Sequence, residues 1–300
     1  MASVVLSKDE KLFIKNGVFD DFRLDGRARR DYRYFEIETG IVSNTSGSAR
    51  LRLSKTDILV GVKAEIGEPA FGHPDCGRIE FFVNCSAHAS PKFEGRGGEE
   101  LSSELSRILD RACSNKSALD LKSLSITSGQ QCWVLYVDAL VLECGGNLYD
   151  ALSIAVKAAL HDTRIPNVTV NIEDGEVELE FSDDPFDCSR LDIKNIPLYV
   201  TLNKIESVFV VDASMEEEFC CDGQLLVAVN GDRNICGIQR LGYSAVEPEL
   251  MAEMLEVAVD IGSSLNKRLL QALEIEEKNS STEKVGFVPT VEYTSEIVGE

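Results

Sequence analysis

Apolar and polar positions alternate in several short stretches near the start of the chain. A period of two residues is typical of strands with one buried face, and it predicts strands over residues 34–42, 49–53, 57–66 and 77–86. A short charged helix over residues 7–16 is expected before them, with an apolar anchor of Leu12, Phe13 and Ile14. Helical spacing over residues 99–114 predicts an amphipathic helix whose buried stripe is Leu101, Leu105, Ile108, Leu109 and Ala112. A further strand is predicted over residues 121–131.

The chain is organised around residues 133–160. Both alternating sets of the run 133–142 are mostly apolar, so we predict a central strand that is covered on both faces. Gly145 and Gly146 then break the strand, because glycine turns through positive φ at little cost. Asn147 is a good helix N-cap, with Asp150 three residues later. One face of the following helix is expected to pack on the strand through Leu148, Leu152, Ala155, Val156 and Ala159.

The second half of the chain is predicted to have a similar make-up, with strands and a helix. A hairpin is predicted over residues 168–172 and 176–181, and the polar residues 182–195 are the best candidate boundary between two halves. Strands are predicted over residues 197–204, 207–212, 225–230 and 235–241. Pro248 opens a long helix whose inner stripe is Leu250, Met254, Val257, Ala258, Ile261, Leu265 and Leu269.

Beyond about residue 274 the chain becomes acidic and polar, which is typical of a mobile tail. Residues 285–291 keep some apolar character, so a partner-bound segment is the alternative there. We therefore divide the chain into an N-terminal helix with an arginine-rich loop, a first half, a second half and an acidic mobile tail, over residues 1–30, 31–182, 183–274 and 275–300.

Charge and cysteine content narrow the class of protein. The chain has 51 acidic and 30 basic residues, a formal net charge of −21, so any nucleic-acid contact must be local or shared with a more basic partner. Its nine cysteines include no CxxC pair, which favours reduced thiols in an intracellular protein over a disulfide frame or a zinc site. We find no signal peptide and no apolar run of about 18 residues, so no membrane span is expected.

Three places could carry chemistry. A strand–glycine–helix turn often binds phosphate, but residues 145–147 include no Lys, Arg, Ser or Thr, which favours a structural turn. Residues 20–33 hold the densest basic cluster, for which pairing with local aspartates is favoured over phosphate contact: Arg23, Arg27, Arg29, Arg30 and Arg33. Asp212 and the acids at 216–218 follow a predicted strand, where they could hold Mg²⁺ or cap a helix, and we favour the structural alternative.

Two further arginines share one face of the helix predicted over residues 99–114. Arg107 and Arg111 are four residues apart, so their side chains are neighbours on the helix surface. A solvated face with local ion pairs, Asp110 included, is the usual explanation for such a pair. The alternative is a pair of arginines that points into an opening.

An ordered set of motifs resembles the RNase PH family, and more narrowly the RNase PH-like ring subunits of the RNA exosome. The motifs are RLDGR at 23–27, the strand pair at 49–69, GRGGEELSSELSRILDR at 95–111, VDALVLECGGNLYDA at 137–151 and PLYVTLNKIESVFVVDASMEEE at 197–218. The resemblance covers residues 22–270. It implies an α+β, RNase PH-like fold of two βαβ-containing halves, with mixed sheets backed by helices.

The resemblance also implies a chemistry, which is phosphorolysis of RNA from its 3′ end with phosphate held by a Gly-Ser/Thr-Arg turn. Here the turn matches residues 146–148, so the hydroxyl and the arginine are both missing. Asp212 and Glu218 fall at the family's acidic positions, with Glu in place of an Asp. Acids without a phosphate cradle repel incoming phosphate. We therefore expect no catalytic residue, cofactor or metal, and treat Asn147, Asp212 and Glu218 as degenerate active-site positions.

RNA contact is implied at other positions. In archaeal relatives of this kind, the non-catalytic subunit lends arginines from the helix after the glycine-rich loop to RNA that enters beside an active neighbour. Arg107 and Arg111 match two such positions, and a third falls on Ser114. Together with Arg96 and Arg27 they are the expected RNA-binding residues, and they would neutralise phosphates without reading sequence.

The function implied is a non-catalytic structural and RNA-path subunit of the exosome core ring, which supports 3′-to-5′ processing and degradation of rRNA and mRNA. Its partners would be RNase PH-like ring subunits, cap subunits and RNA, with no membrane, in nucleus, nucleolus and cytoplasm. The alternative is an active phosphorolytic 3′-to-5′ exoribonuclease that uses Asp212 and Glu218. A small-molecule phosphotransferase ranks last, because the sequence lacks a Gly/Ser-rich nucleotide loop.

Overall fold

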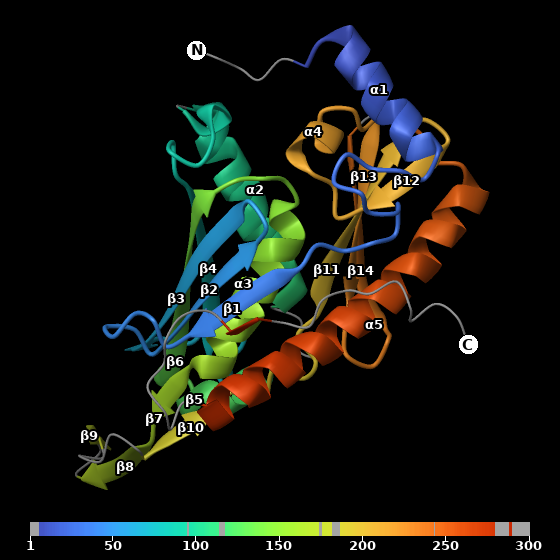
Figure 1. The fold of residues 1–300 in the computed structure, drawn as a ribbon. Coiled ribbons are helices and arrows are strands. Elements are labelled where there is room, and N and C mark those ends of the chain that lie inside the picture. The colour runs from blue at the N-terminus through green and yellow to red at the C-terminus, as the bar shows by residue number, and fades with distance from the viewer. Residues whose placement is uncertain are drawn as a thin grey trace.

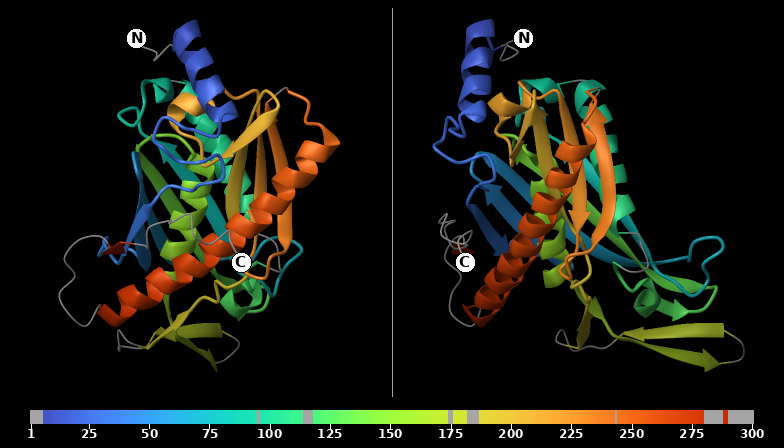
Figure 2. Two further views of the ribbon diagram at one scale, coloured as in Figure 1. Left: turned by 45° about the vertical axis from the view of Figure 1, so that its right-hand side comes forward. Right: turned by 90° about the vertical axis from the view of Figure 1, so that its right-hand side faces the viewer.

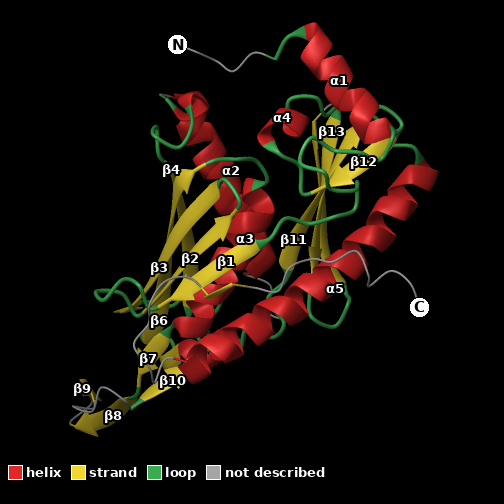
Figure 3. Ribbon diagram, in the orientation of Figure 1, coloured by secondary structure: helices red, strands yellow, loops and turns green. Residues whose placement is uncertain are grey.

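The computed structural model describes residues 6–94, 96–113, 118–173, 176–181, 187–242, 244–279 and 288–289 of the 300-residue chain. Two β-sheets face each other across helix α3 (Leu148–Asp162), and the long helix α5 (Pro248–Asn279) runs diagonally past both (Figure 1). Figure 3 shows this alternation of strand and helix layers directly.

The first sheet has seven strands, in the order β15–β1–β2–β3–β6–β4, with β5 paired to β6 beside that path. Strands β4 and β6 are parallel and are joined through helix α2 (Arg96–Cys113), which makes a β–α–β unit. The strands are β1 (Phe35–Thr39), β2 (Gly47–Leu53), β3 (Thr56–Gly67), β4 (Arg78–Cys85), β5 (Ser125–Thr127), β6 (Gln131–Glu143) and β15 (Val288–Pro289).

The second sheet has the order β12–β11–β13–β14, and each of its pairings is antiparallel. Its strands are β11 (Leu198–Ile205), β12 (Val208–Val211), β13 (Gly223–Val229) and β14 (Ile235–Gly242). A short helix, α4 (Met215–Glu218), follows β12 and begins at a capping box formed by Ser214 and Glu217. Mixed and antiparallel sheets backed by helices confirm the predicted α+β class.

Helix α3 is buried on almost every side, since Leu148 and all of residues 150–160 are buried. The prediction of a single packing face was therefore wrong. α3 packs on β2 and β3 on one side and on β11 on the other. The hydroxyl of Ser153 accepts the backbone N–H of Tyr199 over 3.0 Å, which ties the helix to the second sheet.

The prediction that β6 is covered on both faces was also wrong. Its odd-numbered side chains from Trp133 to Val141 are buried, whereas Asp138 and Leu142 on the other face are exposed. In the described part of the chain, β4 and the short β5 are the strands that pair with β6 on the side away from β3. An apolar residue on an open sheet face looks the same in sequence as a buried one, so the pattern overstated the burial.

Two further expectations need correction near the start of the chain. In helix α1 (Lys8–Phe19) the anchor is Ile14 with Val18, while Leu12 and Phe13 are 58% and 68% exposed. The strand predicted over residues 121–131 is instead a 3₁₀ turn, η2 (Leu121–Leu124), followed by the short β5 and a bend before β6. The side chain of Asp120 accepts the N–H of Lys122, which favours the 3₁₀ turn over an extended strand.

Another 3₁₀ turn, η1 (Pro91–Phe93), precedes α2.

A pair of small sheets extends from the far end of α3. Strand β7 (Arg164–Pro166) pairs with β10 (Cys188–Arg190), which lies inside the predicted polar connection. The predicted hairpin is confirmed as β8 (Val168–Glu173) and β9 (Glu176–Phe181), and it projects from the body of the protein (Figure 2). Residues 182–186 lie outside the described part of the chain.

Some residues of the predicted tail lie in regular elements. Helix α5 continues through residues 275–279, and β15 adds to the outer edge of β1, with Glu36 opposite Pro289 and Ile37 opposite Val288. The rest of the predicted tail, residues 280–287 and 290–300, falls outside the described residues.

Candidate functional site at the glycine turn

The turn between β6 and α3 meets the end of β12 and the loop over residues 20–33. Gly146 has a φ of 99°, a conformation that other residues rarely adopt. A Cβ at this position would lie 2.6 Å from the backbone nitrogen of Met215. The glycine therefore lets the segment before α4 touch the start of α3, which brings the predicted positions Asn147, Asp212 and Glu218 together.

Asp212 is fully buried, and two arginines hold its carboxylate. Arg33 binds it with two nitrogens, Nη2 at 2.8 Å from Oδ1 and Nε at 2.9 Å from Oδ2, and the Arg33 backbone N–H also donates to Oδ2 over 2.8 Å. Arg27 Nη1 lies 3.0 Å from Oδ2. The Arg33 and Arg27 side chains are only 8% and 14% exposed, so both charges are used inside the fold.

The ionisation of Asp212 follows from these contacts. Burial by itself raises the pKa of the carboxyl group, but the charge and hydrogen bonds of Arg33, with those of Arg27 and Asn147, outweigh burial and lower the pKa to about 2. Asp212 is therefore a permanent anion at neutral pH whose charge is already matched. A carboxylate in this state stabilises the fold and has no proton to give.

The side chain of Asn147 points inward. Its Nδ2 donates to Asp212 Oδ1 over 2.6 Å and to Asp150 Oδ2 over 2.9 Å. Asn147 does occupy the N-cap position of α3, but with φ 56° it is left-handed and its side chain makes no capping hydrogen bond. The predicted side-chain cap was therefore wrong, because the amide is held by two buried acids.

Glu218 supplies the negative charge at the start of α3. Its Oε1 accepts the backbone N–H of Asn147 over 2.7 Å. A helix N-terminus with free N–H groups is where an external anion would bind. In this chain the backbone N–H of Asn147 donates instead to a carboxylate of the protein itself, that of Glu218.

Asp150 is a second fully buried acid, which sequence reasoning assigned only to the helix cap. It accepts hydrogen bonds from Thr201 Oγ1 at 2.6 Å and from Tyr32 Oη at 3.1 Å, besides that from Asn147. Burial raises the pKa of Asp150 to about 7, against the opposing effect of the hydrogen bonds from Thr201 and Asn147. Its partners come from β11 and from the loop before β1, so no local spacing could reveal them.

The arginine-rich loop serves mainly to hold the fold. Arg23 is buried; its Nε lies 2.8 Å from Glu217 Oε1, and its Nη2 lies 2.9 Å from the carbonyl oxygen of Asp212. Arg29 pairs with Asp21, a local aspartate as expected. Arg33 was not singled out as a site residue, and the only sequence signal for it was its place in the basic cluster.

A cavity of about 340 Å³ opens beside the glycine turn. Its charged lining is mostly acidic, since Arg33 and Lys55 face Asp25, Glu143, Glu216 and Glu217. A phosphate group entering it would meet more negative than positive side chains. Within the described residues, no group of three or more His, Cys, Asp or Glu is placed to hold a metal ion.

The remaining predicted RNA-binding residues lie elsewhere, on α2. Arg96 is its first residue, and Arg107 and Arg111 are exposed along its length. Arg107 Nε donates to the carbonyl oxygen of Ser103 over 3.2 Å, and Arg111 Nη1 lies 3.0 Å from Oε1 of Gln239 on β14. Ser114 lies outside the described residues. Arg27 is not part of this group, because it is bound at the glycine turn.

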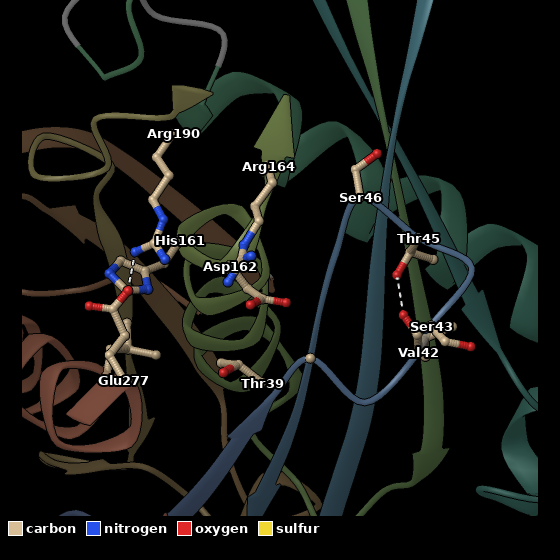
Figure 4. Close-up of a pocket in the computed structure, with 12 residues that line it drawn as sticks. Thr39, Val42, Ser43, Thr45, Ser46, His161, Asp162, Arg164, Arg190 and Glu277 are labelled. Carbon is tan, nitrogen blue, oxygen red and sulfur yellow. Dashed lines mark hydrogen bonds and ion pairs between the residues drawn. The ribbon is translucent and has the colours of Figure 1, made fainter. Parts of the chain in front are cut away.

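A second hollow, of about 690 Å³, lies at the other end of α3 (Figure 4). Arg190 pairs there with Glu277, and Asp162 Oδ2 accepts the backbone N–H of Ser48 over 3.0 Å. Burial also lowers the pKa of His161, which keeps that ring neutral at pH 7. The carbonyl end of α3 faces this region, so it does not favour an anion.

Family models match most of the chain, with the 3′ exoribonuclease family, domain 1, over residues 31–166 and domain 2 over residues 195–261. The chain belongs to the RNase PH family of 3′ exoribonucleases. Within this RNase PH fold the glycine turn and Asp212 come from different domains, because residue 146 falls in the first match and residue 212 in the second.

Relatives of known name agree with this assignment. The chain is 38% identical over 251 residues to the exosome complex component Rrp42 of Thermococcus kodakarensis, a match that covers 84% of this chain and 90% of the relative. It is 40% identical over 305 residues to a Dictyostelium discoideum protein with the provisional name exosome complex exonuclease RRP42, covering 86% and 94% of the two chains.

Solved structures show the same fold. A chain of the Archaeoglobus fulgidus exosome with RNA bound to the active site superposes with a TM-score of 0.74 at 30% identity, covering 86% of this RNase PH chain and 97% of that one. A chain of an archaeal exosome core gives a TM-score of 0.71 at 28% identity. Of the helices described, none combines the length and apolar character needed to cross a membrane.

Proposed function

We propose that this chain is a non-catalytic structural and RNA-path subunit of an exosome core ring, which supports 3′-to-5′ RNA processing and degradation. One observation carries the proposal: the groups that would meet phosphate at the glycine turn are bound to the protein's own acids. The Asn147 side chain donates to Asp212, and Glu218 accepts the backbone N–H of Asn147. The naming of relatives as exosome components supports the same assembly.

The argument against catalysis is electrostatic. Phosphorolysis needs a phosphate held beside the 3′-terminal linkage by donors and cations that are free to bind it. Here the guanidinium groups of Arg33 and Arg27 are already paired with Asp212. An entering phosphate would have to displace a buried ion pair and approach Glu218, and both steps raise its free energy.

The RNA path is proposed along α2. Arg107 and Arg111 are exposed on one helical face, and Arg96 stands at the start of the same helix. In a chain of net charge −21, attraction of RNA depends on such local cations. We do not include Arg27 in this path, because its guanidinium group forms ion pairs with Asp25 and Asp212.

The partners proposed are other RNase PH-like subunits, cap subunits and RNA. Exposed apolar residues near the start of the chain support burial in an assembly, since Leu12, Phe13, Phe19, Phe22 and Leu24 are each more than half exposed. We propose the nucleus, nucleolus and cytoplasm as the compartments in which this RNA processing takes place.

The test has two parts. Copurification followed by native mass determination should find the chain in a hetero-oligomer with other RNase PH-like subunits. The purified chain alone, given 3′-labelled RNA and inorganic phosphate, should release no nucleoside diphosphate.

Phosphate-dependent shortening of RNA by the lone chain would overturn the non-catalytic assignment and favour the exoribonuclease alternative. A free monomer with no copurifying subunits would overturn the ring assignment.

A further inference from the structure

Helix α2 is fastened to the outer edge of the first sheet through two serines. Among the strands that the structure describes, β4 is the last on this side of the sheet, so its outward N–H groups meet no further described strand. The N–H of Val83 donates to Ser106 Oγ over 3.0 Å, and the N–H of Cys85 donates to Ser102 Oγ over 3.2 Å. α2 and β4 lie side by side in Figure 1.

The spacing of these bonds fixes the register between helix and strand. Residues four apart on a helix are separated by about 6 Å along its axis, and residues two apart on a strand by about 6.6 Å. Ser102 and Ser106 therefore match Cys85 and Val83, with the two elements running in opposite directions. The Ser106 hydroxyl also donates to the carbonyl oxygen of Ser102 over 2.9 Å, which orients its lone pairs toward β4.

The apolar contacts of α2 do not define this register by themselves. The buried stripe of Leu105, Ile108, Leu109 and Ala112 drives packing, but the hydrophobic effect is non-directional. Two residues beyond Ser106, Tyr199 Oη donates to the carbonyl oxygen of Ile108 over 3.0 Å. The hydrogen bonds at Ser102, Ser106 and Ile108 are the directional contacts that hold the helix in place.

We infer that Ser102 and Ser106 are positioning residues, which set where Arg107 and Arg111 stand on the RNA path. Arg107 directly follows Ser106, and Arg111 lies one turn further along the helix. A shift of α2 along the edge of β4 moves both guanidinium groups relative to Gln239 on β14, the partner of Arg111. The inference rests on the proposed function, because it assumes that these arginines contact RNA.

The test replaces the serines within the assembled ring. In Ser102→Ala with Ser106→Ala, the slope of log binding constant against log salt for single-stranded RNA should become shallower by up to about 1.4, because each lost phosphate contact removes about 0.7. The amides of Val83 and Cys85 should exchange hydrogen faster in the same ring. Ser102→Thr with Ser106→Thr keeps both hydroxyls and should restore the slope.

Ser103→Ala is the matched control, because Ser103 lies on the same helix and is exposed. It should leave the slope and both exchange rates unchanged. If the double alanine ring does not assemble, each single alanine variant is measured instead, with a change of about half the size expected.

A double alanine ring with faster exchange and an unchanged RNA slope would overturn the inference, and the serines would then only seal the edge of β4. A separate arm with Arg107→Glu and Arg111→Glu tests the RNA path itself. If that arm leaves RNA binding unchanged, the RNA-path part of the proposed function fails and the positioning inference fails with it.

Discussion

The side-chain amide of Asn147 lies 2.6 Å from the carboxylate of Asp212, although the two residues are 65 positions apart in the chain. The contact joins the glycine turn of the first sheet to the end of β12 in the second. The resemblance to the RNase PH family predicts a phosphate-binding hydroxyl at the position of Asn147. Here the same position is used to hold the two halves of the protein together.

The ion pairs that Asp212 forms with Arg33 and Arg27 should therefore contribute measurably to the free energy of unfolding. Asp212→Ala leaves Arg33 and Arg27 buried without their carboxylate, and removing one partner of a buried ion pair costs about 3–5 kcal/mol. Urea unfolding of the assembled and the lone chain should show this loss. Glu216→Ala, in the short helix α4 that follows Asp212 along the chain, is the control and should change the free energy of unfolding by less than about 1 kcal/mol.

An opposite pattern would contradict the structural role. If Asp212→Ala left stability unchanged but abolished a phosphate-dependent RNA degradation seen in the unmodified chain, Asp212 would be a catalytic acid.

Gly146 should tolerate no side chain. Gly146→Ala combines a φ of 99° with a Cβ only 2.6 Å from the Met215 nitrogen, so the start of α3 and the segment before α4 must separate. Gly72→Ala is a matched control with a φ of 91° and no atom within 4 Å of the added Cβ. The control should lose about 1–2 kcal/mol from conformational strain alone, and Gly146→Ala should lose about 1–3 kcal/mol more from overpacking. Equal losses in thermal unfolding would show that the close contact does not matter.

Asp150 should make stability depend on pH. Its folded pKa of about 7 lies above the unfolded value, so between these pH values the folded state holds a proton that the unfolded state has released. The free energy of unfolding should therefore fall as pH rises from 4 to 7, by up to about 1.4 kcal/mol per pH unit from this group. Asp150→Asn should remove that component in urea titrations across the same range. An unchanged pH profile in Asp150→Asn would show that Asp150 is ionised throughout.

The arginine pair on α2 should affect RNA binding without affecting assembly. Arg107→Glu with Arg111→Glu reverses two exposed charges, so RNA crosslinking to the ring should weaken, most strongly at low salt where surface charges are least screened. Lys122→Glu with Lys194→Glu reverses the same number of charges at exposed positions outside α2 and serves as the control. Equal crosslinking in the two rings would contradict the proposed path, and loss of assembly in the arginine variant alone would assign these side chains to an interface.

The pattern of apolar and polar residues predicted an element correctly where the residues of that element alone determine its structure. The stripe of α2 predicts its buried face because helical periodicity is a property of neighbouring residues, and the hairpin β8–β9 follows from two short alternating runs around a turn. The pattern failed where burial depends on a distant element. α3 is covered on both sides because β11, from the second half, packs on the face opposite β2 and β3.

The sequence by itself determined that Asn147, which has no hydroxyl, follows the two glycines, and its resemblance to the family predicted that Asn147, Asp212 and Glu218 are degenerate active-site positions. Only the tertiary structure decided what these side chains do. Arg33 binds Asp212 across 179 positions and Asn147 reaches it across 65, so the partners are set by the meeting of two sheets rather than by any local spacing. Buried charges and amides must be satisfied by whichever groups the fold brings near them, and here that requirement makes the glycine turn a contact between the two halves of the protein.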